Sequence, residues 1–197
     1  MKHTKKAIAT RKRIVDTAAQ LIFTAGYGKT KLMDVLQAAN VQKGNFYYYF
    51  TSKDELGLAV MRERGRQLLL DWLNSVISPS TDAWDNLVHV VTEVTHHPQS
   101  NGRPTNPLAN LAYEMGELGE EFRRELANIA ETVIDVLAGE FARLQAQKRL
   151  AAGADPRMLA TFLFSSLAGA LQYFRTTNNA AQLADSVKLA LNAVAPK

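Results

Sequence analysis

The residues best suited to chemistry lie in the run Val41–Lys53, which has the sequence VQKGNFYYYFTSK. At a helical advance of about 100° per residue, its aromatic residues separate into two faces. The face suited to a small core consists of Phe46, Tyr49 and Phe50. The opposite face offers bare backbone, an ammonium, an amide and phenol hydroxyls from Lys43, Gly44, Asn45, Tyr47 and Tyr48.

Groups of the second kind hydrogen-bond to phosphates and to base edges, so this face, together with Gln42 just before it, predicts contact with double-stranded DNA. The alternative is a buried aromatic cluster beside a solvated lysine. That alternative accounts for Phe46 and Phe50, but it does not explain tyrosines on both faces of so short a helix.

The flanking residues predict a helix-turn-helix that positions this face. Apolar residues at i, i+3, i+4 and i+7 indicate an amphipathic helix over Leu32–Ala39, and a tight break follows at Asn40–Gln42. The second helix is expected over Lys43–Tyr49 and would enter the major groove. Ser52, with Glu55 three residues on, predicts a capping box that opens the next helix.

With these motifs in place, the stretch Thr10–Met61 resembles the TetR (tetracycline-repressor) family of bacterial transcriptional regulators. The matching features are, in order, Gly26–Tyr27 after the first helix, Thr30 opening the next, the KGNFYYYF run, and Ser52–Lys53. The resemblance covers about the first third of the chain. Gln42 and Asn45 stand where such proteins often carry small hydroxyl residues, and this departure bears on the operator sequence rather than on the mode of binding.

Two further DNA contacts are expected at helix starts. Thr30 is predicted to cap the helix that follows it, and a capped helix N-terminus is a ready phosphate site. The resemblance implies a phosphate contact for Thr30, and likewise for Lys53. The alternative for Lys53 is an exposed surface lysine.

Composition and charge agree with a DNA-binding protein. Residues 1–64 carry 12 Lys/Arg and five Asp/Glu, a net charge of +7, whereas residues 65–197 carry 11 and 14, a net charge of −3. A basic N-terminal part on a mildly acidic remainder is typical of a polyanion binder. A helix lying on a membrane surface is the alternative, but its apolar stripe is equally what a core-facing helix needs.

The 197 residues contain no cysteine, which excludes disulfides, thiolate catalysis and Cys-based zinc sites. No apolar run approaches membrane length, and no apolar signal core follows the basic N-terminus. The expected location is therefore the cytoplasm, with no membrane partner.

Helical periodicity and an absence of strand-like alternation predict an all-α fold of about nine helices. The helices are expected over residues 6–25, 32–39, 43–49, 53–77, 82–97, 106–115, 120–150, 156–177 and 180–194. The expected domains are a DNA-binding domain over residues 1–52 and a ligand-binding and dimerisation domain over residues 53–197. Gly57 and Gly65 inside the long fourth helix indicate either close packing against a neighbour or a place where the helix bends.

The last two helices are too apolar for an exposed pair, and they predict a homodimer through a four-helix bundle. The resemblance implies the same role. The residues assigned to this interface are Phe162, Leu167, Leu171, Phe174, Leu183, Val187 and Leu191.

A small-molecule pocket is expected among the long C-terminal helices, because aromatic bulk mixed with a few polar groups is typical of ligand sites. The candidate residues are Trp72, Val91, Asn110, Met115, Phe122 and Phe164. Plain core packing is the alternative for each of them.

His89, Glu93 and His96 share one helical face and could hold zinc or nickel. The alternative is that these histidines lie near a helix C-terminus because the helix dipole stabilises positive charge there. No metal or other cofactor is therefore assigned.

The leading functional hypothesis is a dimeric, sequence-specific transcriptional repressor released from its operator by a small-molecule inducer. A DNA-binding regulator controlled only by its abundance or by a protein partner is the alternative. An α-helical enzyme is the third hypothesis, and it is disfavoured because no phosphate loop, catalytic cysteine or Ser/His/Asp order is present. No catalytic residue is assigned.

Overall fold

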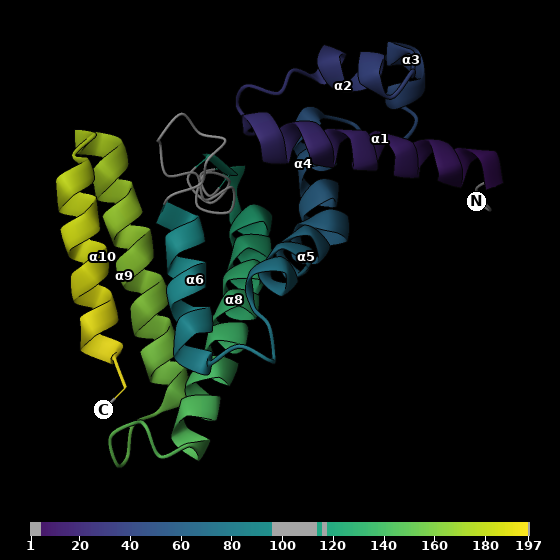
Figure 1. The fold of residues 1–197 in the computed structure, drawn as a ribbon. Helices are drawn as coiled ribbons and strands as arrows, with labels where there is room; N and C mark the ends of the chain where they lie inside the picture. The colour runs from purple at the N-terminus through teal and green to yellow at the C-terminus, as the bar shows by residue number, and fades with distance from the viewer. Residues whose placement is uncertain (1–4, 96–113, 116–117, 197) are drawn as a thin grey trace. The chain divides into compact units, whose positions relative to one another are not determined.

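The computed structural model describes residues 5–95, 114–115 and 118–196, and these residues form helices, turns and loops with no β-strand (Figure 1). The all-α prediction is confirmed. The helices are α1 (Lys5–Ala25), α2 (Leu32–Ala38), α3 (Lys43–Phe46), α4 (Lys53–Val60), η1 (Met61–Gly65), α5 (Arg66–Val76), α6 (Ala83–Thr95), α8 (Glu120–Ala146), α9 (Pro156–Thr177) and α10 (Ala180–Val194). None of the described helices is long and apolar enough to cross a membrane.

The chain divides into two compact units. The head unit comprises Met1–Leu70 and Asn110–Ile129, and the body unit comprises Asp71–Ala109 and Ala130–Lys197. The division therefore falls within α5 and within α8, not at residue 52. The N-terminal helices need the residues around 114–129 to complete a compact unit.

The core of the head unit forms where α1 meets the helices after it. One face of α1 is buried through Ile14, Val15, Ala18, Ala19 and Ile22. α2, α4 and η1 contact α1, and the buried side chains that follow it are Val35, Leu36, Phe46, Phe50, Leu56 and Val60. The 3.6-residue spacing of these apolar positions is what a core-facing helix requires.

Helix termini follow the sequence signals in most places. Gly26 ends α1 with φ +91°, the left-handed conformation that glycine adopts without a Cβ penalty. Asp155 and Asn179 cap α9 and α10 through backbone N–H groups two or three residues on. Ser52 caps α4 by accepting a hydrogen bond from the Glu55 amide at 3.0 Å.

Two predictions at helix starts need correction. The Glu55 carboxylate does not return to the Ser52 amide but accepts hydrogen bonds from the amide and hydroxyl of Thr51, at 2.6 and 2.7 Å. The prediction that Thr30 caps α2 is wrong. The N-cap residue is Lys31, which makes no side-chain cap, and the Thr30 hydroxyl instead donates to the Gly26 carbonyl at 2.8 Å.

The long helix expected after Ser52 is unbroken from Lys53 to Val76 but changes type along its length. α4 passes into η1, a single π-helical segment, and then into α5. A Cβ built on Gly57 would lie 2.8 Å from the Tyr27 ring, and one on Gly65 would lie 3.0 Å from Ile129 Cδ1. Close packing therefore explains both glycines, and the π segment that ends at Gly65 is the irregular point of the helix.

In the body unit a buried polar network joins α6 to α8. Asn86, at zero exposure, accepts a hydrogen bond from the Ser78 amide and donates to the Ser78 carbonyl and the Glu140 carboxylate. Glu140 also pairs with Arg143 at 2.6 Å, and Arg143 donates to the carbonyls of Pro79 and Thr81. These bonds fix the turn before α6, since unpaired buried polar groups would be costly.

The glycine contacts generate the first prediction. Replacing Gly57 with Ala is expected to lower the free energy of unfolding by about 1–3 kcal/mol, because the new methyl group overpacks the Tyr27 ring. Gly139 is the matched control: it lies exposed within α8 with no atom within 4 Å of a built Cβ. Gly139→Ala should raise stability by about 0.5–1 kcal/mol. Urea titrations of both variants measure the difference, and equal effects would contradict the packing argument.

Candidate nucleic-acid interface

The α3 region has the two faces predicted from the sequence. The rings of Phe46 and Phe50 are buried and stacked, with centroids 5.6 Å apart. Tyr47 and Tyr48 are 52% and 61% exposed. Tyr49 lies between these extremes and packs edge-on against Tyr48. The helix itself is shorter than predicted, because α3 ends at Phe46 and a turn carries the three tyrosines.

The exposed face of α3 is stereochemically open. Gln42, Lys43, Gly44 and Asn45 are all exposed, and no atom lies within 4 Å of a Cβ built on Gly44. A backbone free of side chain can approach a phosphate closely. The face thus combines the donors and acceptors that read base edges with an unobstructed backbone.

Lys53 is held in the head unit. Its ammonium donates to the Tyr27 carbonyl at 2.7 Å and lies 4.1 Å from the centroid of the Tyr27 ring. Burial lowers the pKa of Lys53, an effect that the nearby Asp54 and Glu114 carboxylates oppose. It is therefore not the exposed surface lysine of the alternative interpretation, and its contact with phosphate stays a prediction.

Thr30 has no hydroxyl proton to offer a phosphate. Its side chain is only 4% exposed, and that proton is donated to Gly26. The contact of Thr30 with phosphate stays a prediction. The motif indicated that Thr30 matters, but its role here is to close the turn between α1 and α2.

Tyr27 occupies the centre of that turn. Its hydroxyl donates to Asp54 Oδ1. Burial, together with this hydrogen bond, raises the pKa of Tyr27, so the phenol stays protonated. Because Lys53 and Asp54 follow each other at the start of α4, they fix the turn to the helix after α3.

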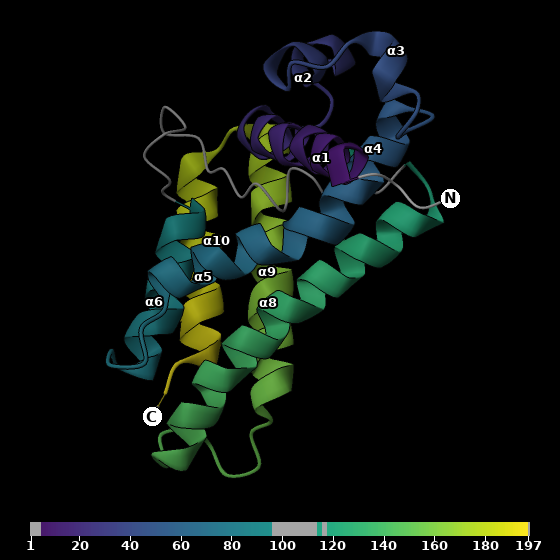
Figure 2. The ribbon, with the colours of Figure 1, turned by 90° about the vertical axis from the view of Figure 1, so that its right-hand side faces the viewer.

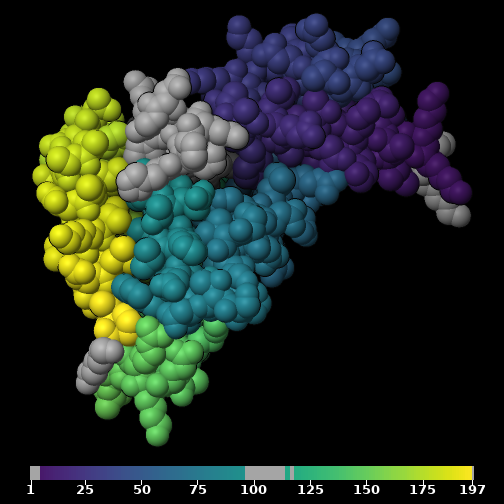
Figure 3. Space-filling model, in the orientation of Figure 1, coloured from purple at the N-terminus to yellow at the C-terminus, as the bar shows by residue number. Residues whose placement is uncertain are grey.

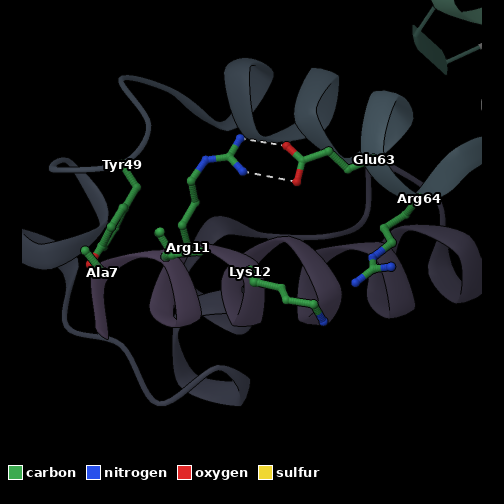
Figure 4. Close-up of a pocket in the computed structure, with 7 residues that line it drawn as sticks. Ala7, Arg11, Lys12, Tyr49, Glu63 and Arg64 are labelled. Atoms are coloured by element: carbon green, nitrogen blue, oxygen red, sulfur yellow. Dashed lines mark hydrogen bonds and ion pairs between the residues drawn. The ribbon is translucent and has the colours of Figure 1, made fainter. Parts of the chain in front are cut away.

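A second charged surface lies between α1 and η1 and was not predicted. Arg11 donates two hydrogen bonds to Glu63, at 3.1 and 2.7 Å, and its guanidinium lies 5.1 Å from the Phe50 ring centroid (Figure 4). The hydrogen bond with Glu63 raises the pKa of Arg11. Arg64 pairs with Asp16. Arg11, Glu63 and Arg64 line a shallow cavity of about 430 Å³, to which Tyr49 also contributes.

The predicted ligand residues belong to different units. Met115 and Phe122 are buried in the head unit, whereas Trp72, Val91 and Phe164 belong to the body unit. Asn110 lies outside the described residues. The body unit instead has a groove of about 370 Å³ along α6, α9 and α10, which is lined by none of the six predicted residues. Its lining includes Trp84, Phe174, Leu183, Val187, Lys188 and Leu191.

Most of the predicted dimerisation residues are protomer core. Leu167, Leu171, Phe174 and Leu183 are buried, and three of them form a cluster with Val94 that Trp72 packs against. Val187 and Leu191 are half-buried and line the groove just described. Of the predicted set only Phe162, at 48% exposed, faces outward. The sequence therefore located the apolar helices but not which of their faces is free.

The outward face of α9 and α10 carries a different set of residues. It forms a second groove of about 430 Å³, with Phe162, Tyr173 and Leu189 exposed around small side chains such as Ser165, Ser166 and Gly169. The α10 side chains lie at the surface in the space-filling view (Figure 3).

The proposed metal ligands remain partly outside the described residues. His89 and Glu93 are exposed on α6, and His96 lies outside the described residues. Among the described residues, no group of three His, Cys, Asp or Glu side chains is arranged to hold a metal ion.

A short helix anchored by two buried rings, preceded by a second helix and an open turn, is the helix-turn-helix of DNA-binding regulators. Comparisons with known proteins agree. Residues 14–60 match the model for bacterial regulatory proteins of the tetR family, and residues 85–189 match that for the tetracyclin repressor-like C-terminal domain. The chain belongs to the TetR family of transcriptional regulators.

The related proteins match this chain over different shares of its length and of their own. The transcriptional regulator AcuR of Cereibacter sphaeroides is 30% identical over 152 residues, 74% of this chain and 67% of that protein. The repressor DhaR of a Mycobacterium species is 24% identical over 94% of this chain and 92% of its own length. A Lactococcus lactis regulator is 32% identical, but the match spans only 62% of its length. The reduced form of Escherichia coli NemR has the same fold, with a TM-score of 0.76 at 23% identity, over 96% of this chain and 98% of that one.

The second prediction separates residues that specify from residues that position. Lys43→Ala and Asn45→Ala should each reduce discrimination between matched and mismatched duplexes by about 1–3 kcal/mol, if the side chain reads a base edge. Tyr48→Phe should weaken both duplexes equally, and Thr92→Val, which removes an exposed hydroxyl from α6, is the control expected to change neither. Binding titrations over a salt series make the measurement.

The same series tests Lys53. A phosphate contact predicts that Lys53→Ala lowers the salt slope by about 1, because one cation is removed from the phosphate backbone. An unchanged slope with lower stability would assign Lys53 to the turn alone. Equal losses on both duplexes for the Lys43 and Asn45 variants would remove those two residues from base readout.

Proposed function

We propose that this protein is a dimeric, operator-specific transcriptional repressor that a small-molecule ligand releases from DNA. The observation that carries the DNA-binding part is the open α3 face, with Lys43, Asn45 and Tyr48 exposed above the buried Phe46 and Phe50 rings. The relatives DhaR and NemR, both named as transcriptional repressors, support the direction of regulation. The site of action would be the cytoplasm.

Dimerisation is proposed through the outward groove of α9 and α10 rather than through the buried leucines. Leu189 is 71% exposed and Phe162 is 48% exposed, and large apolar side chains at such exposure favour contact with a partner. Ser165, Ser166 and Gly169 leave room for a close approach of a second pair of helices. A four-helix bundle with α9 and α10 of the partner protomer would cover the exposed apolar side chains as well as the small residues.

The ligand is proposed to enter the groove along α6, α9 and α10. Its walls are mainly apolar, with Lys188 and Asn192 at the edge, which suits a small and partly apolar molecule. Two of its lining residues, Phe174 and Leu183, belong to the cluster against which Trp72 of α5 packs. A ligand that displaces them would therefore press on α5.

The absence of cysteine sets one limit on regulation. The NemR structure is that of a reduced form, whereas this chain has no cysteine that could be oxidised. We therefore propose non-covalent ligand binding as the signal. A regulator without a ligand remains the second candidate, and it is favoured if nothing binds the groove.

The third prediction concerns symmetry and the dimer. Selection from random DNA should give a near-palindromic site whose two halves lie about 34–36 Å apart or a multiple of that distance. Leu189→Glu should dissociate the dimer, because a buried unpaired charge costs several kcal/mol, and should weaken operator binding at least tenfold. Leu118→Glu, which changes an exposed leucine outside α9 and α10, is the control.

Sedimentation and footprinting measure these quantities. A protected site without inverted symmetry, bound by one chain, would contradict the dimeric model. So would a Leu189→Glu protein that stays dimeric and binds with unchanged affinity.

The fourth prediction concerns release. A ligand found by thermal-shift screening should weaken operator binding by about 1–3 kcal/mol, and operator should weaken the ligand by the same factor because coupling is reciprocal. Ala184→Phe should fill the groove and abolish ligand binding while operator affinity stays the same. Ala181→Phe changes another exposed alanine of α10 that does not line the groove, and should leave ligand binding intact.

Paired titrations with and without the second partner give the coupling. A ligand that binds tightly without changing operator affinity would refute release and favour the ligand-independent regulator.

A further inference from the structure

A carboxylate from outside the helix-turn-helix sequence binds the turn that leads into it. Glu114 Oε2 accepts a hydrogen bond from the Gly28 backbone amide at 2.7 Å, although the two residues are 86 positions apart. The same carboxylate lies over Gly26, where a built Cβ would come within 2.8 Å of Oε1. The two glycines thus leave the space that the carboxylate occupies.

This turn determines where α2 begins. The backbone and hydroxyl of Thr30 both donate to the Gly26 carbonyl, and α2 begins two residues later at Leu32. On its other side the turn is held by α4, through Tyr27 with Asp54 and Lys53. Among the described residues, the segment that connects α1 to α2 is therefore supported by α4 on one side and, from the second half of the head unit, by the Glu114 carboxylate.

The residues after Glu114 attach to the head unit at further points. Met115 is fully buried, with its Cε 3.2 Å from a Cβ built on Gly57. The Phe122 ring lies 6.5 Å from the Tyr27 ring, and Glu125 accepts a hydrogen bond from Arg62 Nε at 3.0 Å. These contacts join Met115, Phe122 and Glu125 to α4, to the turn and to η1.

The segment also continues into the other unit. Its last residues form the first turns of α8, which runs unbroken from Glu120 to Ala146 and so passes from the head unit into the body unit (Figure 2). A hydrogen bond to a carboxylate is shorter and stronger than one to a neutral acceptor. If this segment moves, the Glu114 carboxylate is therefore expected to move the turn that it binds.

We propose that Glu114 is a positioning residue for DNA binding: its carboxylate fixes the Gly26–Gly28 turn, and through that turn the placement of α2 and α3. Operator affinity then depends on where the segment 114–129 sits. Glu114 touches no DNA in this mechanism. A contact that merely added stability would loosen the whole head unit on removal, whereas a positioning contact loosens the turn and the two helices after it.

The test compares Glu114→Ala, Glu114→Gln and the control Glu120→Ala in the full chain. Glu120 lies in the same segment, is exposed and pairs with Arg124. Amide hydrogen exchange without DNA should rise about tenfold or more at Gly28 and across α2 and α3 in Glu114→Ala, with α1 and α9 unchanged. Glu114→Gln should give a smaller rise, because its amide oxygen still accepts from Gly28. The control should match wild type.

Binding to a selected operator duplex and to a random duplex of equal length supplies the second readout. Glu114→Ala should lower operator affinity about tenfold and lower random-duplex affinity less, since non-specific binding depends mainly on charge. Unchanged exchange in α2 and α3 would overturn the proposal, as would a rise spread evenly over the head unit. If Glu114→Ala does not fold, Glu114→Gln decides by the same criteria. The exchange arm needs no DNA, so its outcome is independent of whether the proposed operator binding holds.

Discussion

The burial of Phe46 and Phe50 is the constraint on which the DNA-facing surface depends. A helix of four residues has almost no stability of its own, because nucleation fixes several residues for very few hydrogen bonds. α3 is held instead by two stacked, buried rings that leave Lys43, Gly44 and Asn45 on the outside. The rings fix both the position and the rotation of the short helix, so the exposed donors need no stabilising contacts among themselves.

The remaining parts of the head unit hold those rings in place. Arg11 covers Phe50 and pairs with Glu63 of η1, while Arg62 of the same segment pairs with Glu125. Each exposed ion pair contributes about 0–1 kcal/mol, so their effect is on geometry more than on stability. Together they bind successive residues of the π segment to α1 on one side and to α8 on the other. A change in that segment from π to α would shift the register of these residues and break both sets of contacts.

The head could be predicted from the sequence because its signals are local. The two faces of Lys43–Phe50, the Gly26 stop and the Ser52 cap all depend on residues within a few positions of one another. Predictions failed where distant residues decide. Thr30 turns inward to Gly26, and Glu114 lies against Gly28, 86 positions away in the sequence. For α9 and α10 the periodicity located apolar helices, but both helices have more than one apolar face. Packing inside the protomer buries Leu171 and Leu183, whereas Phe162 and Leu189 stay exposed.

This distribution makes α10 a common wall of the two body grooves. Leu183, Val187 and Leu191 recur every four residues and face the groove beside α6, whereas Ser186, Leu189 and Ala193 line the outward groove. These stripes lie on adjacent faces of one helix, so a rotation of α10 changes both grooves together. A molecule bound beside Leu183 would therefore act on the proposed dimer surface through the helix itself, as well as on α5 through Trp72. In a two-fold dimer the spacing of the recognition helices depends on that surface, and a rigid duplex cannot follow a change in spacing. In the proposed mechanism the body helices would thus couple ligand to operator without any ligand contact to the head unit.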